Sequence, residues 1–509
     1  MELQCPSIQL LFSFLLLVVL VLKIGKRGLK HNSSASNLPP GPRKLPIIGN
    51  LHQLIGALPH RGLRDLAKQH GPLMHLKLGE VSTVVVSSAE LAKEVMTTHD
   101  IIFASRPQFL ATRIIFYDST DIAFAPYSDY WRELRKICTQ ELLNAKRVQS
   151  YRPIREKEVL NLIEWISSRA GSPINLTQKV KSSIYSITAQ AAFGNECKDQ
   201  EEFIYAVKDV IKAISGFNVA DVFPSFKLLH MISGEQHRVE RLQKQVDRIL
   251  ENIIKEHMQA TTKKRDEAHV QEDLVDILLK FHDHCGGREL SLTINNIKAV
   301  ILDVFTAGSD PSAAVVDWTM SEMIKHPRIM KRAQDEVREV FNRARLVNET
   351  SIRGMKYLKL VIQESLRLHP PGVLLLPREC AERCVIDGYE IPAKTRVIVN
   401  AWAIGRDPNY WSNPETFNPD RFLDSSIDYQ GTNFDYIPFG AGRRICPGML
   451  YGLANVELPL AMLLYHFDWK LPNEMKNDDL DMTEEFSVVV DRKQDLHLTP
   501  TPYISSSSY

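Results

Sequence analysis

Apolar positions along the chain follow three patterns, each of which predicts a different kind of element. Ile8 to Leu22 is an almost uninterrupted run of Leu, Val and Phe. Leu73–Leu78 and Thr83–Val86 alternate or run apolar around Gly79-Glu80, and this predicts a β-hairpin. From Ser128 to about Met330 the apolar residues recur mainly at helical spacing. Most of the chain is therefore predicted to be α-helical.

Individual elements can be placed within this pattern. Ser88 is expected to cap a helix that continues through His99. Longer helices are expected at Phe203–Ile214, Glu235–Gln259 and Thr293–Lys325, and strands at Val385–Ile391, Thr395–Asn400 and Phe486–Leu498. No Gly/Ser-rich linker or internal repeat divides residues 51 to 500. The sequence thus predicts one mainly α domain with a small β region over residues 51–509.

The N-terminal apolar run has the length of a membrane anchor. At 1.5 Å per residue, Pro6 to Ile24 would span about 28 Å, close to the thickness of a bilayer core. Four basic residues follow at once and favour a cytoplasmic C-terminal side: Lys23, Lys26, Arg27 and Lys30. Residues 1–30 are therefore predicted to be an uncleaved single-pass anchor. Residues 31–50 are predicted to be a linker with a stiff Pro-rich hinge at Leu38–Pro46.

Charge and cysteine usage narrow the function. A formal net charge of +1 over 509 residues gives no basis for a nucleic-acid partner. The 7 cysteines are odd in number and scattered, as in a protein that stays in a reducing compartment. Cys380 and Cys384 lie four apart, but no second ligand pair follows them, so a zinc site is not expected.

The strongest chemical signal is the segment Phe439–Gly448, which reads FGAGRRICPG. A thiolate that binds haem iron must lie close to the porphyrin, and glycines such as Gly440 allow the backbone to approach it. Arg444 can donate to a haem propionate, and backbone N–H groups can donate to the Cys446 sulfur. The alternative is a Gly-rich turn around a buried free cysteine. With five positions matched, the thiolate ligand is the favoured interpretation.

This segment matches Phe-x-x-Gly-x-Arg-x-Cys-x-Gly, so the chain resembles the cytochrome P450 monooxygenases, and among them the plant microsomal, terpenoid-oxidising group. The resemblance covers nearly the whole chain. It implies a cytochrome P450 fold with a buried haem b, whose iron is ligated by Cys446. The resemblance further implies two groups of haem-contacting residues. The first lies in the cysteine loop and contains Phe439, Gly440 and Arg444, and the second contains Trp131, Arg135 and Arg378.

A second motif is structural. Glu364 and Arg367 are three apart in a helical stretch and share a face, which by itself is typical of a surface ion pair. The sequence Pro419–Phe422 contains Arg421, and the resemblance implies that this arginine joins the other two in a buried triad. Buried charges are tolerated when each is paired. The triad is expected to support the haem pocket without taking part in the chemistry.

The segment Ala307–Ser312 resembles the oxygen-activating part of the family, in which a threonine hydroxyl normally helps to deliver protons. Here Pro311 takes the place of that threonine. A proline inside a regular helix costs about 3 kcal/mol, but we expect it to fit a kink where the Ala307 carbonyl is already released. Ser312 lies about 100° further around the helix and is not expected to point where the threonine would. Asp310 with ordered water is therefore expected to supply protons, with Ser312 as a second candidate.

Apolar side chains from several segments are expected to surround a substrate. Each of them alone is equally consistent with ordinary core packing, but together they predict a large pocket with few polar anchors. Such a pocket suits a terpenoid, with a diterpene (macrocyclic ones included) preferred over a sesquiterpene. The expected pocket residues are Phe109, Ile114, Phe116, Leu302, Phe305, Ala307, Val373, Leu374 and Val488.

The resemblance implies a monooxygenase that uses O2 and takes electrons from NADPH through NADPH–cytochrome P450 reductase. It also implies an endoplasmic reticulum location with a cytosolic catalytic domain. Arg132, Lys136 and Arg443 are candidates for the reductase-docking face, although exposed basic residues are usually just solvated.

Two alternatives remain. A haem-thiolate peroxide isomerase or dehydratase would need no reductase; Pro311 favours it, and the compact cysteine loop opposes it. A haem sensor or carrier would not need an apolar pocket beside an acidic residue.

Overall fold

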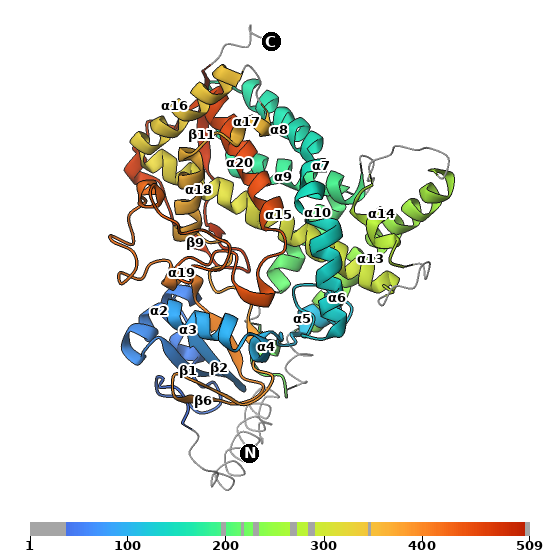
Figure 1. The fold of residues 1–509 in the computed structure, drawn as a ribbon, viewed down its shortest axis with the longest axis vertical. Helices are drawn as coiled ribbons and strands as arrows, with labels where there is room; N and C mark the ends of the chain where they lie inside the picture. The colour runs from blue at the N-terminus through green and yellow to red at the C-terminus, as the bar shows by residue number, and fades with distance from the viewer. Residues whose placement is uncertain are drawn as a thin grey trace, which may run out of the picture.

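The computed structural model describes residues 37–194, 200–214, 218–226, 234–264, 272–282, 291–344 and 348–503. The predicted anchor, residues 1–30, and the first part of the linker lie outside these ranges. Within them the protein is mainly helical, with four small sheets, as the apolar pattern predicts. Figure 1 shows the sheet that contains β1 and β2 at one end of the molecule and the long helices filling the other.

The helices follow one another through the chain as α2 Pro59–His70, α3 Ala89–Lys93, α4 Asp100–Phe103, α5 Leu110–Ile115, α6 Asp129–Ile137, α7 Ala145–Ser150, α8 Arg152–Ser167, α9 Leu176–Phe193, α10 Gln200–Ala213, α11 Val219–Val222, α13 Glu235–Lys264, α14 Leu274–Leu279, α15 Ile294–Lys325, α16 Pro327–Ala344, α17 Glu349–Ile352, α18 Tyr357–Leu368, α19 Ala401–Ile404 and α20 Met449–His466. The strands are β1 Leu73–Leu78, β2 Val81–Val86, β3 Ile174–Asn175, β4 Arg378–Glu379, β5 Cys384–Ile386, β6 Tyr389–Ile391, β7 Arg396–Val399, β8 Phe467–Lys470, β9 Glu484–Glu485, β10 Asp491–Arg492 and β11 His497–Pro502.

The largest sheet has the strand order β1-β2-β7-β4. The predicted hairpin is present, because β1 and β2 are antiparallel with Leu73 opposite Val86. Strand β7 then joins β2 in parallel, and β4 pairs antiparallel with β7 so that Arg378 lies opposite Val397. This pairing brings β2 and β7, which lie far apart in the sequence, side by side.

Two of the predicted strands are wrong in detail. Val385–Ile391 is a hairpin of β5 and β6, because Asp387 and Gly388 between them have φ values of 49° and 76° and turn the chain. Phe486–Leu498 contains only β10 and the start of β11, and residues 486–490 form no strand. The apolar side chains of residues 486–490 pack in the core or line pockets, and neither role requires the backbone to pair as a strand.

The predicted helix after Ser88 is present, and the Ser88 hydroxyl accepts a hydrogen bond from the N–H of Leu91. Its second half, Glu94–Thr98, is wound more widely as a π-helix.

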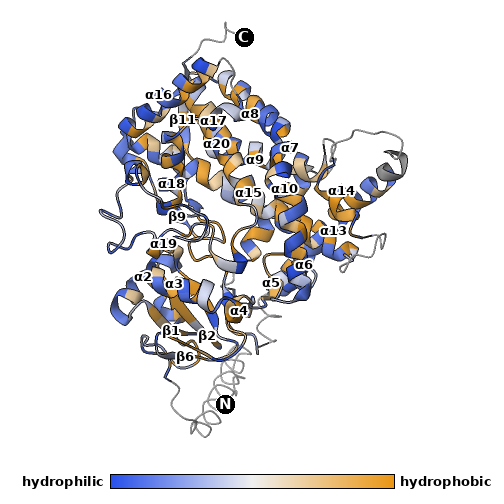
Figure 2. Cartoon of the chain, in the orientation of Figure 1, coloured by the Kyte–Doolittle hydropathy of each residue, from blue (hydrophilic) through white to orange (hydrophobic). Residues whose placement is uncertain are grey.

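The core is organised around α15, which packs against α9 and α20. Its length and composition would suffice for a membrane span, yet most of it is buried within the described part of the protein. Outer helices are amphipathic: α16 buries Met330, Ala333, Val337 and Phe341, spaced three or four apart. Figure 2 shows hydrophobic residues along α20 and on β1 and β2, whereas α16 carries hydrophilic ones.

Helix α15 continues without interruption from Ile294 to Lys325, with Pro311 inside it. The kink expected at Ala307 therefore does not break the helix. Proline has a φ close to that of a helix and removes only one hydrogen bond. Buried neighbours on both sides, among them Asp310 and Ser312, hold this part of α15 in place.

Candidate active site

One cavity of about 320 Å³ brings the sequence motifs together. The cysteine loop forms one wall, with Phe439, Gly440, Arg444 and Cys446. Helix α15 forms another, with Asp303, Ala307, Gly308, Pro311 and Ser312. Residues that are more than a hundred positions apart in the sequence therefore line the same space.

The cysteine loop is shaped by glycines and by its own backbone hydrogen bonds. Gly440 and Gly442 both have a φ of 70°, which other residues rarely adopt. A Cβ at Gly442 would also overlap the carbonyl oxygen of Met96. The N–H of Cys446 donates to the Phe439 carbonyl at 2.9 Å and closes the loop. The loop thus holds one cysteine at a defined place on the cavity wall.

Cys446 also differs in exposure from the other described cysteines. It is only partly buried, whereas Cys138, Cys380 and Cys384 are buried. Burial raises the pKa of the Cys446 thiol, and the N–H of Gly448 and the positive charge of Arg135 act in the opposite direction. Helix α20 begins at Met449, so the sulfur lies near the positive end of a helix dipole. These groups favour a thiolate once a metal removes the proton.

Four arginines converge on the same cavity: Arg106, Arg135, Arg378 and Arg444. Their partners are mainly uncharged carbonyl groups, although Arg378 also pairs with the Asp100 carboxylate at 3.4 Å. Arg444 donates to the carbonyls of Ala104 at 2.7 Å and of Ala125 at 2.6 Å, and Arg106 donates to that of Leu376 at 2.6 Å.

These four arginines leave a surplus of positive charge at one end of the cavity. Desolvation, and then the charge of Arg378, lower the pKa of Arg444 to about 9. Carbonyl groups do not neutralise a guanidinium, so the cluster fits an anionic group such as the propionates of haem. Arg106 was not singled out by the sequence, because an arginine before a proline in an apolar stretch carries no distinctive pattern.

Trp131 lies behind this cluster and is not among the residues that line the cavity. Its indole N–H donates to the Ile122 carbonyl at 3.0 Å. The Arg444 guanidinium stacks over its ring at 3.9 Å from the ring centre. Arg135, one turn further along α6, does line the cavity and donates to the Ile445 carbonyl.

The structure brings Glu364, Arg367 and Arg421 together in the interior. Arg367 donates to the Glu364 carboxylate through two nitrogens, at 2.7 and 2.8 Å. Arg421 Nε donates to the same carboxylate at 2.9 Å. Each charge is paired, which makes their burial tolerable. The triad does not line the cavity and braces the loop that precedes the cysteine segment.

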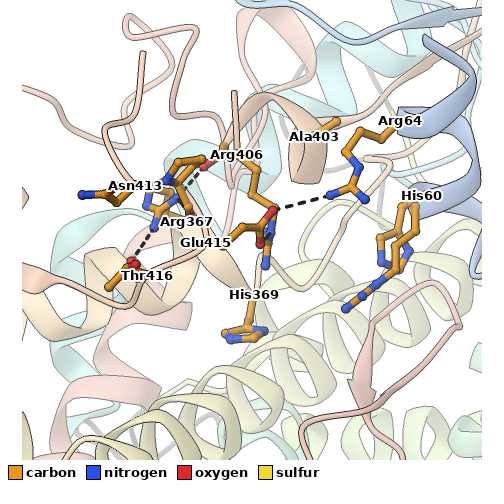
Figure 3. A network of polar contacts seen from close by, with 12 residues as sticks. His60, Arg64, Arg367, His369, Ala403, Arg406, Asn413, Glu415 and Thr416 are labelled. Carbon is orange, nitrogen blue, oxygen red and sulfur yellow. Dashed lines mark hydrogen bonds and ion pairs between the residues drawn. The ribbon is translucent and has the colours of Figure 1, made fainter. Parts of the chain in front are cut away.

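Figure 3 shows how this region continues. Arg367 donates to the carbonyl of Thr416 at 3.2 Å. Beside it, the Glu415 carboxylate lies between Arg406 at 3.1 Å and Arg64 at 3.5 Å. The polar network therefore connects the triad to α2.

The two residues expected to deliver protons face different surroundings. The Asp310 carboxylate is buried and accepts a hydrogen bond from the Tyr185 hydroxyl at 2.5 Å. Desolvation raises the pKa of Asp310, and the hydrogen bond from Tyr185 opposes this rise. Ser312 lines the cavity, but its hydroxyl donates back to the Gly308 carbonyl at 3.0 Å. Pro311 lies on the cavity wall between them.

The structure also places on the cavity wall an acidic residue that no sequence motif indicated. Asp303 lies one turn before Ala307 on the cavity wall and accepts hydrogen bonds from the N–H groups of Ile122 at 3.1 Å and Ala123 at 2.9 Å. Desolvation raises the pKa of Asp303 to about 7. The neighbouring Asp121 is also buried, and its pKa is raised by desolvation and by the charge of Asp303. The available signal in the sequence was an aspartate within an apolar stretch of the predicted helix, four residues before Ala307.

The expected substrate residues divide into three groups. Phe116, Ala307 and Val488 line the large cavity, and Phe109, Val373, Leu374 and Val488 line a smaller pocket beside it. Ile114, Leu302 and Phe305 line neither and pack in the core between α15 and its neighbours. Phe305, for example, lies against Phe203 with 4.8 Å between ring centres, because it projects from a different side of α15 than Ala307 does.

Comparisons with known proteins agree with this geometry. The sequence matches the Cytochrome P450 family over residues 39–498, and the chain belongs to this family. It is 57% identical to cytochrome P450 71D11 of Lotus japonicus, over 94% of this chain and 98% of that protein. It is 54% identical to desmethyl-deoxy-podophyllotoxin synthase of Sinopodophyllum hexandrum, with 96% of each chain covered.

A third relative is premnaspirodiene oxygenase of Hyoscyamus muticus, 50% identical over 98% of both chains. A zebrafish cytochrome P450 solved with progesterone has the same fold, with a TM-score of 0.75, 25% sequence identity, and coverage of 88% of this chain and all of that one. The protein is accordingly a cytochrome P450 monooxygenase, and the family's cofactor is haem b.

The residues present fit that cofactor. Cys446 would hold the iron from the loop side, and the arginine cluster would hold the propionates. When bound, haem b with a thiolate ligand activates dioxygen and inserts one oxygen atom into a C–H bond. The chain itself surrounds the cavity with mainly apolar walls and keeps the Cys446 sulfur in place through the loop.

Proposed function

We propose that this protein is a membrane-anchored monooxygenase that hydroxylates a hydrophobic terpenoid, a diterpene in preference to a sesquiterpene. The observation that carries this proposal is the cavity in which Cys446 faces apolar side chains such as Phe116, Val304 and Val488. Burial of apolar surface would be the main source of substrate affinity there. One relative is named for oxygenation of premnaspirodiene, which agrees with a terpenoid.

Proton delivery is proposed to use Asp310 and ordered water, with Ser312 at the cavity wall. The Lys181–Asp491 ion pair, 2.6 Å long, provides charges near Asp310 on the side away from the cavity. Asp310 can hold a proton because burial disfavours its charged form. A water molecule would then have to connect it to the cavity, since Pro311 provides no hydroxyl.

Electrons are proposed to come from NADPH through NADPH–cytochrome P450 reductase at the endoplasmic reticulum. Residues 1–30 would anchor the chain, residues 31–50 would set its distance from the bilayer, and residues 51–509 would form the cytosolic catalytic domain. Arg132, Lys136 and Arg443 have side chains about half exposed, at 55, 58 and 48%, and would belong to the docking face. Arg443 lies in the cysteine loop itself, so this face would be close to the haem edge.

The experiment is incubation of microsomes that contain the protein and the reductase with a panel of terpene skeletons. A new oxygenated product that forms with NADPH and not without it would support the proposal. The panel should include macrocyclic and polycyclic diterpenes and bicyclic sesquiterpenes. Absence of any NADPH-dependent product from the whole panel would count against a terpenoid substrate.

A second candidate function is the rearrangement or dehydration of an organic peroxide. The observation that favours it is Pro311 on the cavity wall in place of a hydroxyl-bearing residue. It is tested in the same microsomes with a lipid hydroperoxide and no NADPH. Rapid loss of the hydroperoxide under these conditions, with no terpene product under the others, would favour this alternative.

A further inference from the structure

A small pocket of about 50 Å³ lies beside the large cavity. The two spaces share wall residues, namely Phe124, Ile214, Leu375, Leu376 and Val488. Among the described residues, none of those that line the small pocket comes from the cysteine loop. The small pocket therefore extends the cavity in a direction away from Cys446.

The small pocket is apolar except for Arg396 and Ser487. Arg396 comes from strand β7 and is only 5% exposed. Its Nη2 donates to the backbone carbonyl of Asp221 at 3.0 Å, and its guanidinium lies 4.9 Å from the centre of the Phe109 ring. Its Nε has no hydrogen-bond partner among the described residues.

The hydroxyl of Ser487 is buried in the same pocket and also lacks a partner among the described residues. A buried donor without a partner costs roughly 1–3 kcal/mol, and more for a charged group. Two such groups in one small space, one on β7 and the other in the strandless segment 486–490, indicate a place built for an acceptor atom.

The charge around Arg396 decides what kind of acceptor fits. No carboxylate forms an ion pair with Arg396 within the part of the chain that the structure describes, but Asp221 and Glu379 support its positive charge from a greater distance. The guanidinium therefore needs a hydrogen-bond acceptor more than a full counter-charge. The remaining walls, such as Val373, Leu374 and Ile398, are apolar and disfavour a carboxylate.

We propose that Arg396 and Ser487 form a polar subsite that binds a neutral carbonyl oxygen of the substrate, as in a ketone, ester or lactone. This inference rests on the proposed function, because the apolar body of the ligand would occupy the cavity beside Cys446. The carbonyl would be held at the end remote from the carbon that is oxidised. Arg396 and Ser487 would thus determine both which terpenoids bind and which carbon faces the cysteine side.

The test uses two bicyclic sesquiterpenes, the hydrocarbon valencene and its ketone nootkatone. Each is titrated into the haem-loaded protein, and the shift of the Soret band gives a dissociation constant that does not depend on turnover. Arg396→Met is expected to weaken nootkatone binding roughly tenfold, the usual effect of losing a hydrogen bond to a charged group. Valencene binding should change less than about twofold, because it has no acceptor to lose.

Two further variants separate recognition from folding. Arg396→Lys keeps the charge and should retain part of the preference for nootkatone. Ser487→Ala should weaken nootkatone binding roughly threefold, because the variant loses a neutral hydrogen bond to the ketone oxygen. Valencene binding should not change. If Arg396→Met does not incorporate haem, the Ser487→Ala titration decides the question.

The contrary outcomes are distinct. If both ligands bind the wild-type protein and the variants change their affinities equally or not at all, the subsite is wrong and the two polar groups bind only water. If neither ligand shifts the Soret band of wild-type protein that carries haem, the pocket does not accept bicyclic sesquiterpenes, which counts against the terpenoid pocket itself, and the subsite is rejected with it.

Discussion

The Tyr185 hydroxyl donates a hydrogen bond to Oδ1 of Asp310 at 2.5 Å, and this contact turns the Asp310 carboxylate of α15 toward α9. The residue on its C-terminal side, Pro311, faces the cavity instead. Pro311 has no hydroxyl, so the proposed proton supply from Asp310 to the cavity would need a bridging water molecule. This relationship leads to the first prediction.

Pro311→Thr is expected to raise the coupling of NADPH use to product formation by less than about twofold, because the proposed water relay from Asp310 would already perform the task of the missing hydroxyl. The measurement is the ratio of product formed to NADPH consumed. Pro311→Ala restores the backbone N–H without a hydroxyl and serves as the control. A gain of tenfold or more with threonine, and none with alanine, would show that the native relay is impaired.

Cys446→Ser is expected to abolish the long-wavelength Soret band of the reduced, carbon-monoxide-treated protein, since that band requires a thiolate ligand. Cys138→Ser is the matched control: Cys138 is also a free cysteine but is fully buried away from the cavity. The control should keep the band. Retention of the band in Cys446→Ser would contradict the assignment of the iron ligand.

Gly442→Ala is expected to prevent stable haem incorporation. The added Cβ would overlap the Met96 carbonyl oxygen at a residue whose φ is +70°, a strain of roughly 1–3 kcal/mol from the backbone alone. Gly62→Ala on α2 is the control, because the nearest atom to a Cβ there lies 3.7 Å away and Gly62 does not line the cavity. Haem content per protein, measured by absorbance, should fall for the first variant only. Equal haem content in the two variants would show that the cysteine loop can adjust to the added Cβ without losing haem.

Asp303→Asn is expected to make stability less dependent on pH. The pKa of Asp303 is raised from its ordinary 3.8 to about 7 in the folded protein. Between these values the folded protein keeps a proton that the unfolded chain releases, so stability falls as pH rises, by at most about 1.4 kcal/mol per pH unit. Above pH 7 the fall ends, and below the ordinary pKa both states are protonated.

This prediction is measured as the thermal midpoint at several pH values between 4.5 and 8. The difference between wild type and Asp303→Asn should grow in favour of the variant up to about pH 7. Asp335→Asn, at an exposed position on α16, should follow the wild type at every pH. A variant curve parallel to that of wild type would show that Asp303 is ionised throughout.

Local motifs account for the parts of this protein that could be predicted. The hairpin of β1 and β2, the Ser88 cap and the cysteine loop depend on short-range hydrogen bonds and on glycines with positive φ. The pair Glu364 and Arg367 was likewise visible from helical spacing. Such features involve neighbours in the sequence, so their residues can be recognised without knowledge of the fold.

The sequence by itself determined the family and the largely helical domain and singled out Cys446 as the candidate iron ligand, because each follows from local spacing or from a motif of adjacent residues. Only the tertiary structure decided that Asp310 faces Tyr185, that Arg106 joins the other arginines, and that Phe305 packs in the core. It also decided that Arg396 and Ser487, 91 positions apart in the printed sequence, share one pocket. The direction in which a buried polar side chain points is set by the partners that satisfy it, and those partners come from distant segments that meet only when the chain folds.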